Sequence, residues 1–152
     1  MITEKASHKL RIRHYRHGDF EEIMNIWILT GMGDPERGDD ETIIENSIRM
    51  GGALIVLEDL SSGKLIGTSW MTFDGRRILL HHFGILPEYQ GNGFSKILLK
   101  ESLAFVKEKG YQVKLEVHST NHKASNLYKK LGFKPLGDYD IYIIRDVSKI
   151  IQ

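Results

Sequence analysis

The sequence contains no cysteine, which excludes disulfides, thiolate nucleophiles and cysteine metal ligands. It also lacks an excess of charge of one sign, because 21 basic residues balance 20 acidic ones to a formal net charge of +1. Because the basic and acidic residues are nearly equal in number, the overall charge does not indicate a nucleic-acid partner. No apolar run approaches the roughly twenty residues that a membrane span needs. We therefore expect neither a nucleic-acid nor a membrane partner.

The N-terminal residues 1–9 lack the apolar block of a signal peptide. We expect a flexible polar tail there and a cytoplasmic protein. Residues 10–152 have a length typical of one domain, and neither a repeat nor a linker interrupts them. Hydrophobic residues at 41% and charged residues at 27% are ordinary for a globular protein. The sequence thus predicts a single domain over 10–152.

The first part of this domain is expected to contain one strand and two helices. Residues 10–15 alternate apolar and polar side chains, as a half-buried strand does. Asp19 is expected to begin a helix, and Glu22 stands where it would complete a capping box. The glycine-rich residues 31–38 predict a loop, and residues 40–50 predict a second helix.

The remainder alternates strands and helices. We expect strands at 53–58, 65–73, 77–86 and 112–118, helices at 95–109 and 121–131, and a closing hairpin from 133–136 and 139–145. This order predicts an α/β protein with one mixed sheet and helices packed on it.

A glycine-rich loop joins the strand at 77–86 to the helix that follows. The strand ends at Pro87, Gly91 and Gly93 follow, and the helix begins at once. A helix N-terminus offers unpaired N–H groups and positive dipole charge, and glycines let an anion approach them. The loop therefore suits a pyrophosphate, although it matches neither the Walker motif nor the dinucleotide fingerprint. An ordinary strand-to-helix turn is the alternative.

Two motifs carry a resemblance to a known family. Gln90-Gly91-Asn92-Gly93-Phe94-Ser95 resembles the Q/R-x-x-G-x-G/A motif of GCN5-related N-acetyltransferases (GNAT), except for serine at the last position. Leu115-Glu116-Val117, followed by Asn121, Tyr128 and Phe133, resembles the family's L-E-V…N-x-x-A-x-x-L-Y-x-x-x-G-F stretch. The motifs stand in the family's order, and the resemblance covers nearly the whole chain. It implies the acyl-CoA N-acyltransferase fold: a mostly antiparallel sheet of six to seven strands, splayed fourth and fifth strands, and about four helices.

The resemblance also implies that acetyl-CoA is the co-substrate and lies between the splayed strands. The backbone of Phe83, Gly84 and Ile85 would pair with the pantetheine arm, and Asn121 would bond the cofactor near its thiol. The residues implied to hold the pyrophosphate are Gln90, Gly91, Asn92, Gly93, Phe94, Ser95 and Lys96.

Acetyl transfer to an amine needs an acid for the departing thiolate. Tyr128 is the candidate, because a phenol of ordinary pKa near 10 is protonated at neutral pH. The alternative is that Tyr128 is a core aromatic of its amphipathic helix. Direct attack without a covalent enzyme intermediate agrees with the lack of cysteine.

Two residues are candidates for the base. Glu116 faces away from the apolar side of its strand and matches the base of ribosomal-protein N-terminal acetyltransferases; the alternative is a solvated glutamate paired with Lys114 or His118. His81 shares strand parity with Phe83 and Ile85 and resembles the base of arylalkylamine acetyltransferases. His82 is expected to point to the opposite face as a structural residue. The motif context narrowly favours Glu116.

Other features leave the acceptor open. The histidines do not have metal-ligand spacing, so no metal is expected. The acidic stretch 34–41 either attracts a cationic substrate or is simply solvated, and the arginines at 11, 13 and 16 are expected at the surface.

The predicted reaction is acetylation of a primary amine, either a small molecule or a peptide amino terminus. The alternative is a non-catalytic acetyl-CoA sensor. The apolar residues Val147, Ile150 and Ile151 leave a homodimer possible.

Overall fold

A computed structural model describes residues 1–5 and 8–151; residues 6, 7 and 152 of the expected tail and domain lie outside this range. The contacts divide the chain into two compact units, Met1–Glu116 and Val117–Gln152. The single domain over 10–152 therefore stays a prediction.

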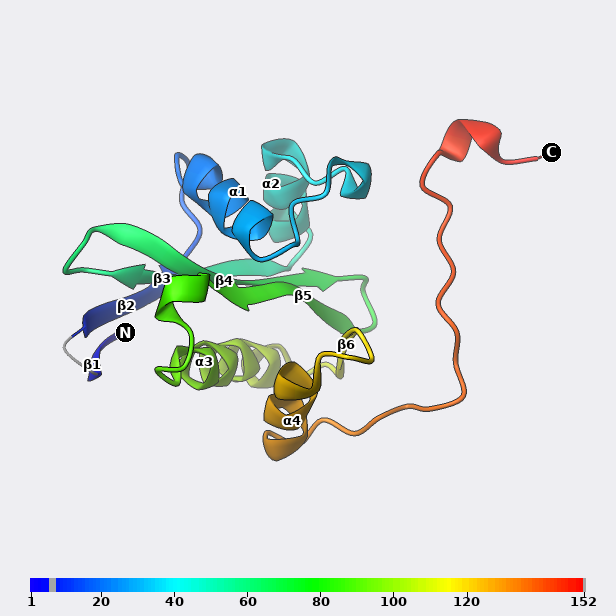
Figure 1. Cartoon of the computed structure of the whole chain (residues 1–152). Coiled ribbons are helices and arrows are strands. Elements are labelled where there is room, and N and C mark those ends of the chain that lie inside the picture. The colour runs from blue at the N-terminus through cyan, green and yellow to red at the C-terminus, as the bar shows by residue number, and fades with distance from the viewer. Residues whose placement is uncertain (6–7, 152) are drawn as a thin grey trace. The chain divides into compact units, whose positions relative to one another are not determined.

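The first unit is built on a six-stranded sheet in the order β1-β2-β3-β4-β5-β6 (Figure 1). The strands are β1 (Ile2–Lys5), β2 (His8–His14), β3 (Ala53–Asp59), β4 (Lys64–Phe73), β5 (Ile78–Ile85) and β6 (Val113–Leu115). Neighbours are antiparallel, except that β5 and β6 are parallel. The expected mixed, mostly antiparallel sheet is confirmed. Strand β1, however, arises from residues for which a flexible tail was predicted.

Helices cover both faces of this sheet. In Figure 1, α1 (Phe20–Leu29) and α2 (Glu41–Arg49) lie on one face and α3 (Phe94–Lys109) on the other. The side chains of β4 alternate between the two layers: the Trp70 ring stacks on Trp27 of α1 at 5.5 Å, whereas Ser69 accepts a hydrogen bond from Ser102 of α3 at 2.7 Å. These side chains are buried, so β4 is a central strand covered on both faces.

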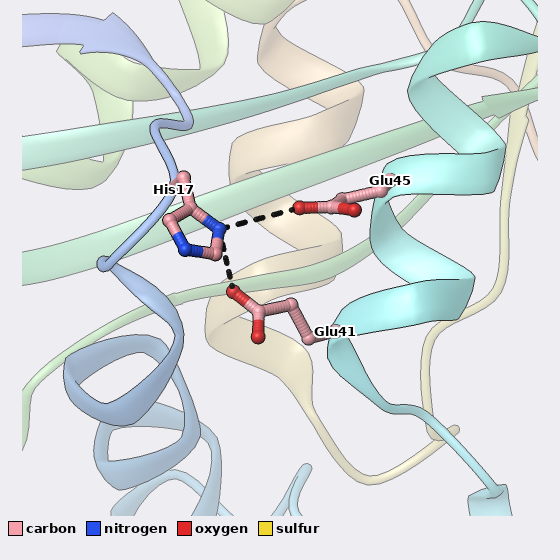
Figure 2. A group of neighbouring side chains, drawn as sticks. All are labelled: His17, Glu41 and Glu45. Atoms are coloured by element: carbon pink, nitrogen blue, oxygen red, sulfur yellow. Dashed lines mark ion pairs between the residues drawn. The ribbon is translucent and has the colours of Figure 1, made fainter.

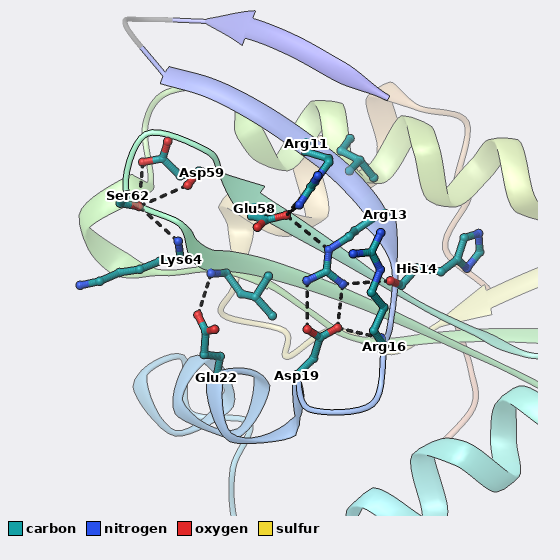
Figure 3. Close-up of polar contacts among 12 residues, drawn as sticks. Arg11, Arg13, His14, Arg16, Asp19, Glu22, Glu58, Asp59, Ser62 and Lys64 are labelled. Carbon is teal, nitrogen blue, oxygen red and sulfur yellow. Dashed lines mark hydrogen bonds and ion pairs between the residues drawn. The ribbon is translucent and has the colours of Figure 1, made fainter.

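The start of α1 differs from the expected capping box (Figure 3). Asp19 has helical backbone angles and makes no side-chain cap; its carboxylate instead accepts hydrogen bonds from Arg13 Nη1 and Nη2 at 2.7 and 2.9 Å. Glu22 accepts from the backbone N–H of Leu65 on β4. The capping-box prediction is wrong because both carboxylates bind partners on the sheet. Arg13 also bonds Glu58 and is only 13% exposed, so it is not a surface arginine.

The second unit contains α4 (His122–Lys130) and a short 3-10 helix at Val147–Lys149. Among its described residues, 133–146 form no strand, so the predicted closing hairpin is wrong. Pro135 has no N–H for a strand ladder, and Gly137 and Asp138 both have positive φ. In the described part of the chain as a whole, the helices are too short or too polar to cross a membrane.

Candidate active site

The parallel pair β5 and β6 is open at one end. Pairing is limited to Ile78 with Val113, Leu79 with Lys114, and Leu80 with Leu115. Strand β6 ends there, short of the predicted residue 118, whereas β5 continues to Ile85. These two strands correspond to the fourth and fifth of the expected fold, and their pairing stops after three residue pairs because β6 ends. The last five residues of β5 thus run beyond the end of β6.

A β-bulge interrupts β5 in this open stretch. Thr68 pairs with Gly84 and Trp70 pairs with His81, so His82 and Phe83 together lie opposite the single residue between them on β4. His82 has a φ of +46°, which few residues other than glycine adopt. Bulges of this kind re-aim side chains and occur often beside active sites.

The bulge brings the two adjacent imidazoles together. His81 Nδ1 lies 2.9 Å from His82 Nδ1. The His81 ring lies 4.6 Å from Trp70, and the His82 ring 4.3 Å from Trp27, so both occupy the face covered by α1 and α2. The prediction that His82 points to the opposite face is wrong, because the extra residue breaks strand alternation. For the same reason His81 shares its face with Gly84 and not with Ile85.

The surroundings of the imidazoles favour the neutral form of His81. The pKa of His81 is lowered to about 4, mainly by burial and also by the nearby His82 and Arg37, whereas Asp39 opposes the shift. Asp39 Oδ2 lies 2.9 Å from His82 Nε2, at ion-pair distance but without the angle of a hydrogen bond. Asp39 comes from the loop before α2. The sequence indicated that loop only as an acidic stretch, so the contact was missed.

The predicted phosphate loop has the expected local form. It contains a 3-10 turn at Pro87–Tyr89, after which Gly91 and Gly93 both have positive φ, +81° and +74°. Gly93 is the N-cap of α3, and no described side chain caps this helix. The first N–H groups of an α-helix have no intrahelical partner, so those of α3 can receive an anion. Lys96, in the first turn, is exposed.

Two predicted cofactor residues shape this loop from within. The Gln90 side-chain amide donates to the Ile85 carbonyl oxygen at 2.9 Å, tying the loop to the end of β5. The Asn92 side-chain amide donates to the Tyr89 carbonyl oxygen at 3.1 Å. Phe94 is buried at 1% exposure and anchors the start of α3. The structure therefore brings the predicted loop residues together beside the open end of β5.

Glu116 follows directly after β6. Its carboxylate lies 3.6 Å from Lys114 Nζ, and its side chain is 46% exposed. This is the ion pair of the alternative interpretation. Both residues line a pocket with Arg77 and Leu79 at the start of β5. The phosphate loop follows the other end of that strand.

The remaining predicted residues lie in the second unit. Tyr128 is 7% exposed, and burial raises its pKa to about 12. Its ring contacts Phe133 at 5.6 Å. Asn121 is the N-cap of α4, and its side-chain oxygen accepts from the Ala124 N–H at 3.2 Å. Their catalytic and cofactor roles stay predictions.

A third group of ionisable side chains lies at the surface (Figure 2). His17 Nδ1 is 3.5 Å from Glu41 and 3.6 Å from Glu45, and Tyr15 donates a hydrogen bond to Glu41. The sequence did not indicate this cluster. With His17 86% exposed, these are ion pairs of the kind that contributes little to stability.

The model of the "Acetyltransferase (GNAT) family" matches residues 20–133. The chain belongs to this family. A curated relative is the acetyltransferase SG1711 of Sodalis glossinidius, 26% identical over 130 residues, which cover 82% of this chain and 87% of the relative.

Solved structures of GNAT acetyltransferases share the fold. The ribosomal-protein-S18-alanine N-acetyltransferase of Escherichia coli has a TM-score of 0.70 and 20% identity, with 82% of this chain and 77% of that chain covered. An acetyltransferase of Clostridium acetobutylicum, solved with acetyl-CoA, has a TM-score of 0.69 and 16% identity, with 88% and 96% covered. At these identities the likeness establishes the fold alone.

Proposed function

We propose that this GNAT protein transfers the acetyl group of acetyl-CoA to a primary amine by direct attack in a ternary complex. The observation that carries the proposal is the open end of β5, which continues past β6 and leads into the phosphate loop. An extended thioester arm and its pyrophosphate need these two features side by side. The acetyl-CoA-bound Clostridium structure has the same fold and supports this assignment.

In this proposal the first unit binds the cofactor. The pantetheine arm pairs with the backbone of β5 between Phe83 and Ile85, and the pyrophosphate lies against residues 90–96. A backbone N–H of β5 polarises the thioester carbonyl as a preorganised dipole. A side chain at Gly84 would place its Cβ 2.9 Å from the Met32 methyl group, so glycine lets the loop after α1 approach the strand closely.

The chemistry then requires an acid for the thiolate. We assign this role to Tyr128, whose pKa of about 12 keeps the phenol protonated at every physiological pH. Asn121 bonds the cofactor near its thiol. Both assignments rest on the family motif, and each can be tested by substituting the residue.

For the acceptor we propose a small amine or a peptide amino terminus. Both classes are cationic at neutral pH, and the acidic residues 34–41 precede and begin α2, on the face that carries the imidazoles. A negative loop raises the local concentration of such substrates. The Escherichia coli relative, named for a ribosomal-protein alanine, supports the peptide option.

The test is release of free CoA in the presence of an amine panel. Because the chain has no cysteine, a thiol-reactive dye reports CoA alone. The panel should include polyamines, arylalkylamines, amino acids and a peptide with a free N-terminal alanine, with mass spectrometry of the product. We expect thiol release that depends on one class of amine. Acetyl-CoA binding by calorimetry without thiol release for any amine would support the sensor instead.

A further inference from the structure

Three side chains lie in a row on the face of the sheet beneath α1 and α2. Asp39 Oδ2 lies 2.9 Å from His82 Nε2, and His82 Nδ1 lies 2.9 Å from His81 Nδ1. Asp39 comes from the loop before α2, and the histidines come from the bulge of β5. The Thr68 hydroxyl holds the bulge by donating to the His82 carbonyl oxygen at 2.8 Å.

Electrostatics decides which ring nitrogens of His81 and His82 carry protons. A short contact between two Nδ1 atoms requires that one carry a proton and the other accept it. If His82 donated, its bare Nε2 would face the Asp39 carboxylate, lone pair against anion. If His81 donates, His82 carries its proton on Nε2, the nitrogen that lies 2.9 Å from the Asp39 carboxylate at ion-pair distance but without the angle of a hydrogen bond. The second arrangement is favoured, and it leaves His81 Nε2 as a bare acceptor.

That acceptor has no partner. His81 Nε2 is buried and makes no hydrogen bond with any described residue. A buried polar atom without a partner costs about 1–3 kcal/mol, and a catalytic role is one of the reasons why a native structure keeps such an atom. His82 Nε2 is likewise buried without a hydrogen bond, but it lies 2.9 Å from the Asp39 carboxylate. The Trp70 ring of β4 lies against His81, and the Trp27 ring of α1 lies against His82. The charged groups that act on His81, besides His82, are Asp39 and Arg37 from the loop before α2. The Asp39 carboxylate is therefore the nearby counter-charge.

We propose that His81 is the catalytic base and that His82 and Asp39 are positioning residues that relay and stabilise its proton. The inference rests on the proposed acetyl transfer. One proton leaves the acceptor ammonium and binds His81 Nε2, directly or through one water. The proton on His81 Nδ1 moves to His82 Nδ1. His81 ends neutral, His82 is the cation beside Asp39, and the neutral amine attacks the thioester.

The relay removes an objection to His81 as the base. Burial disfavours a cation on His81, whose pKa is lowered to about 4, so this imidazole alone would take up a proton poorly. Passing the charge to His82 places it 2.9 Å from a carboxylate. The rival base, Glu116, instead pairs with Lys114 and is 46% exposed.

The experiment compares the wild type with Asp39→Asn, His82→Gln, His81→Gln and Glu116→Gln. The control is Glu45→Gln, which removes a carboxylate from an exposed histidine contact at 3.6 Å. Full-length protein labelled with ¹⁵N-histidine reports ring protonation by NMR, independently of activity. The second readout is kcat/KM against pH, measured with the amine that the panel of amines identifies as substrate.

We expect NMR to show His82 protonated on Nε2 and His81 on Nδ1. The Asp39 carboxylate opposes the lowering of the His81 pKa, so Asp39→Asn should move the acidic limb of kcat/KM to lower pH, by about one unit. It should also lower the plateau about 10-fold, and His82→Gln should lower the plateau similarly. His81→Gln should lose about 10²-fold or more. Glu45→Gln should match the wild type.

Three results would overturn the relay: a protonated His82 Nδ1 with bare Nε2, an Asp39→Asn variant with the wild-type pH profile, or rate loss in Glu116→Gln with full rate in His81→Gln. A wild-type protein that acetylates no amine, with the ring protonation as expected, would instead reject the proposed function and the catalytic role with it.

Discussion

The hydroxyl of Thr68 joins the bulge of β5 to α1. It donates to the His82 carbonyl oxygen at 2.8 Å and accepts from the Trp27 indole N–H at 3.0 Å. Thr68 is fully buried, so water cannot replace either bond. This single hydroxyl fixes the backbone that carries the two imidazoles.

Thr68→Val should therefore lower the free energy of unfolding strongly, although the two side chains have nearly the same shape. It leaves a buried carbonyl and a buried N–H without partners, at about 2 kcal/mol or more in total. Thr68→Ser keeps the hydroxyl and loses one methyl, at about 1 kcal/mol. Urea unfolding of the two variants measures the difference. Equal losses would show that the hydroxyl does not hold the bulge.

Gly93→Glu tests the phosphate loop. Gly93 has a φ of +74°, so any side chain costs about 1–2 kcal/mol, and glutamate adds a negative charge at the start of α3. Gly93→Ala carries the same backbone cost without the charge. We expect calorimetry to show that Gly93→Glu abolishes CoA binding and that Gly93→Ala keeps most of it. Equal affinity in the two folded variants would place the pyrophosphate elsewhere.

Tyr128→Phe tests the proposed acid. The change keeps the ring contact with Phe133 and removes the hydroxyl, so turnover should fall about 10²-fold with little change in CoA affinity. Because burial raises the pKa of Tyr128 to about 12, the phenol should cause no basic limb below about pH 10. Unchanged turnover in single-turnover experiments would mean that another group or water protonates the thiolate.

Asp19→Asn tests the ion pair at the start of α1. Burial raises the pKa of Asp19, but hydrogen bonds from Arg13 and the Arg16 N–H outweigh it, so the pKa lies below its usual value of 3.8. Asp19 therefore adds stability above pH 3.8 that is lost as the pH falls through the lowered pKa. At pH 7 the variant should lose about 1–3 kcal/mol, measured by urea unfolding.

The control for Asp19→Asn is Glu21→Gln, an exposed residue in the same helix turn. The deficit of Asp19→Asn should shrink on acidification, whereas Glu21→Gln should follow the wild type throughout. A deficit that does not change with pH would show that the carboxylate charge is not what stabilises the helix start.

Local patterns predicted most elements of the first unit. The helix expected at 95–109 is α3 at Phe94–Lys109, because glycines mark both of its ends. The strand expected at 77–86 is β5 within one residue at each end. The splay of β5 and β6 came only from the family resemblance, since no local pattern says where two distant strands separate.

The bulge and the Asp39 contact were not predictable in this way. A bulge at His82 contains no glycine, so residue types gave no sign of it, and the assumed alternation then put the imidazoles on opposite faces. Asp39 reaches His82 through tertiary packing between segments more than forty residues apart. The predicted closing hairpin is absent from the described residues 133–146, where Pro135 lacks an N–H for a strand ladder and Gly137 and Asp138 have positive φ.

The bulge also changes which mutations matter along β5. A substitution at His81 removes one imidazole, but deletion of one residue between Leu80 and Gly84 would restore regular alternation and turn a histidine toward α3. The sheet, the phosphate loop and β5 would survive that deletion, but the proposed base His81 would be lost from its face. The length of this strand therefore determines which side of the sheet each histidine faces.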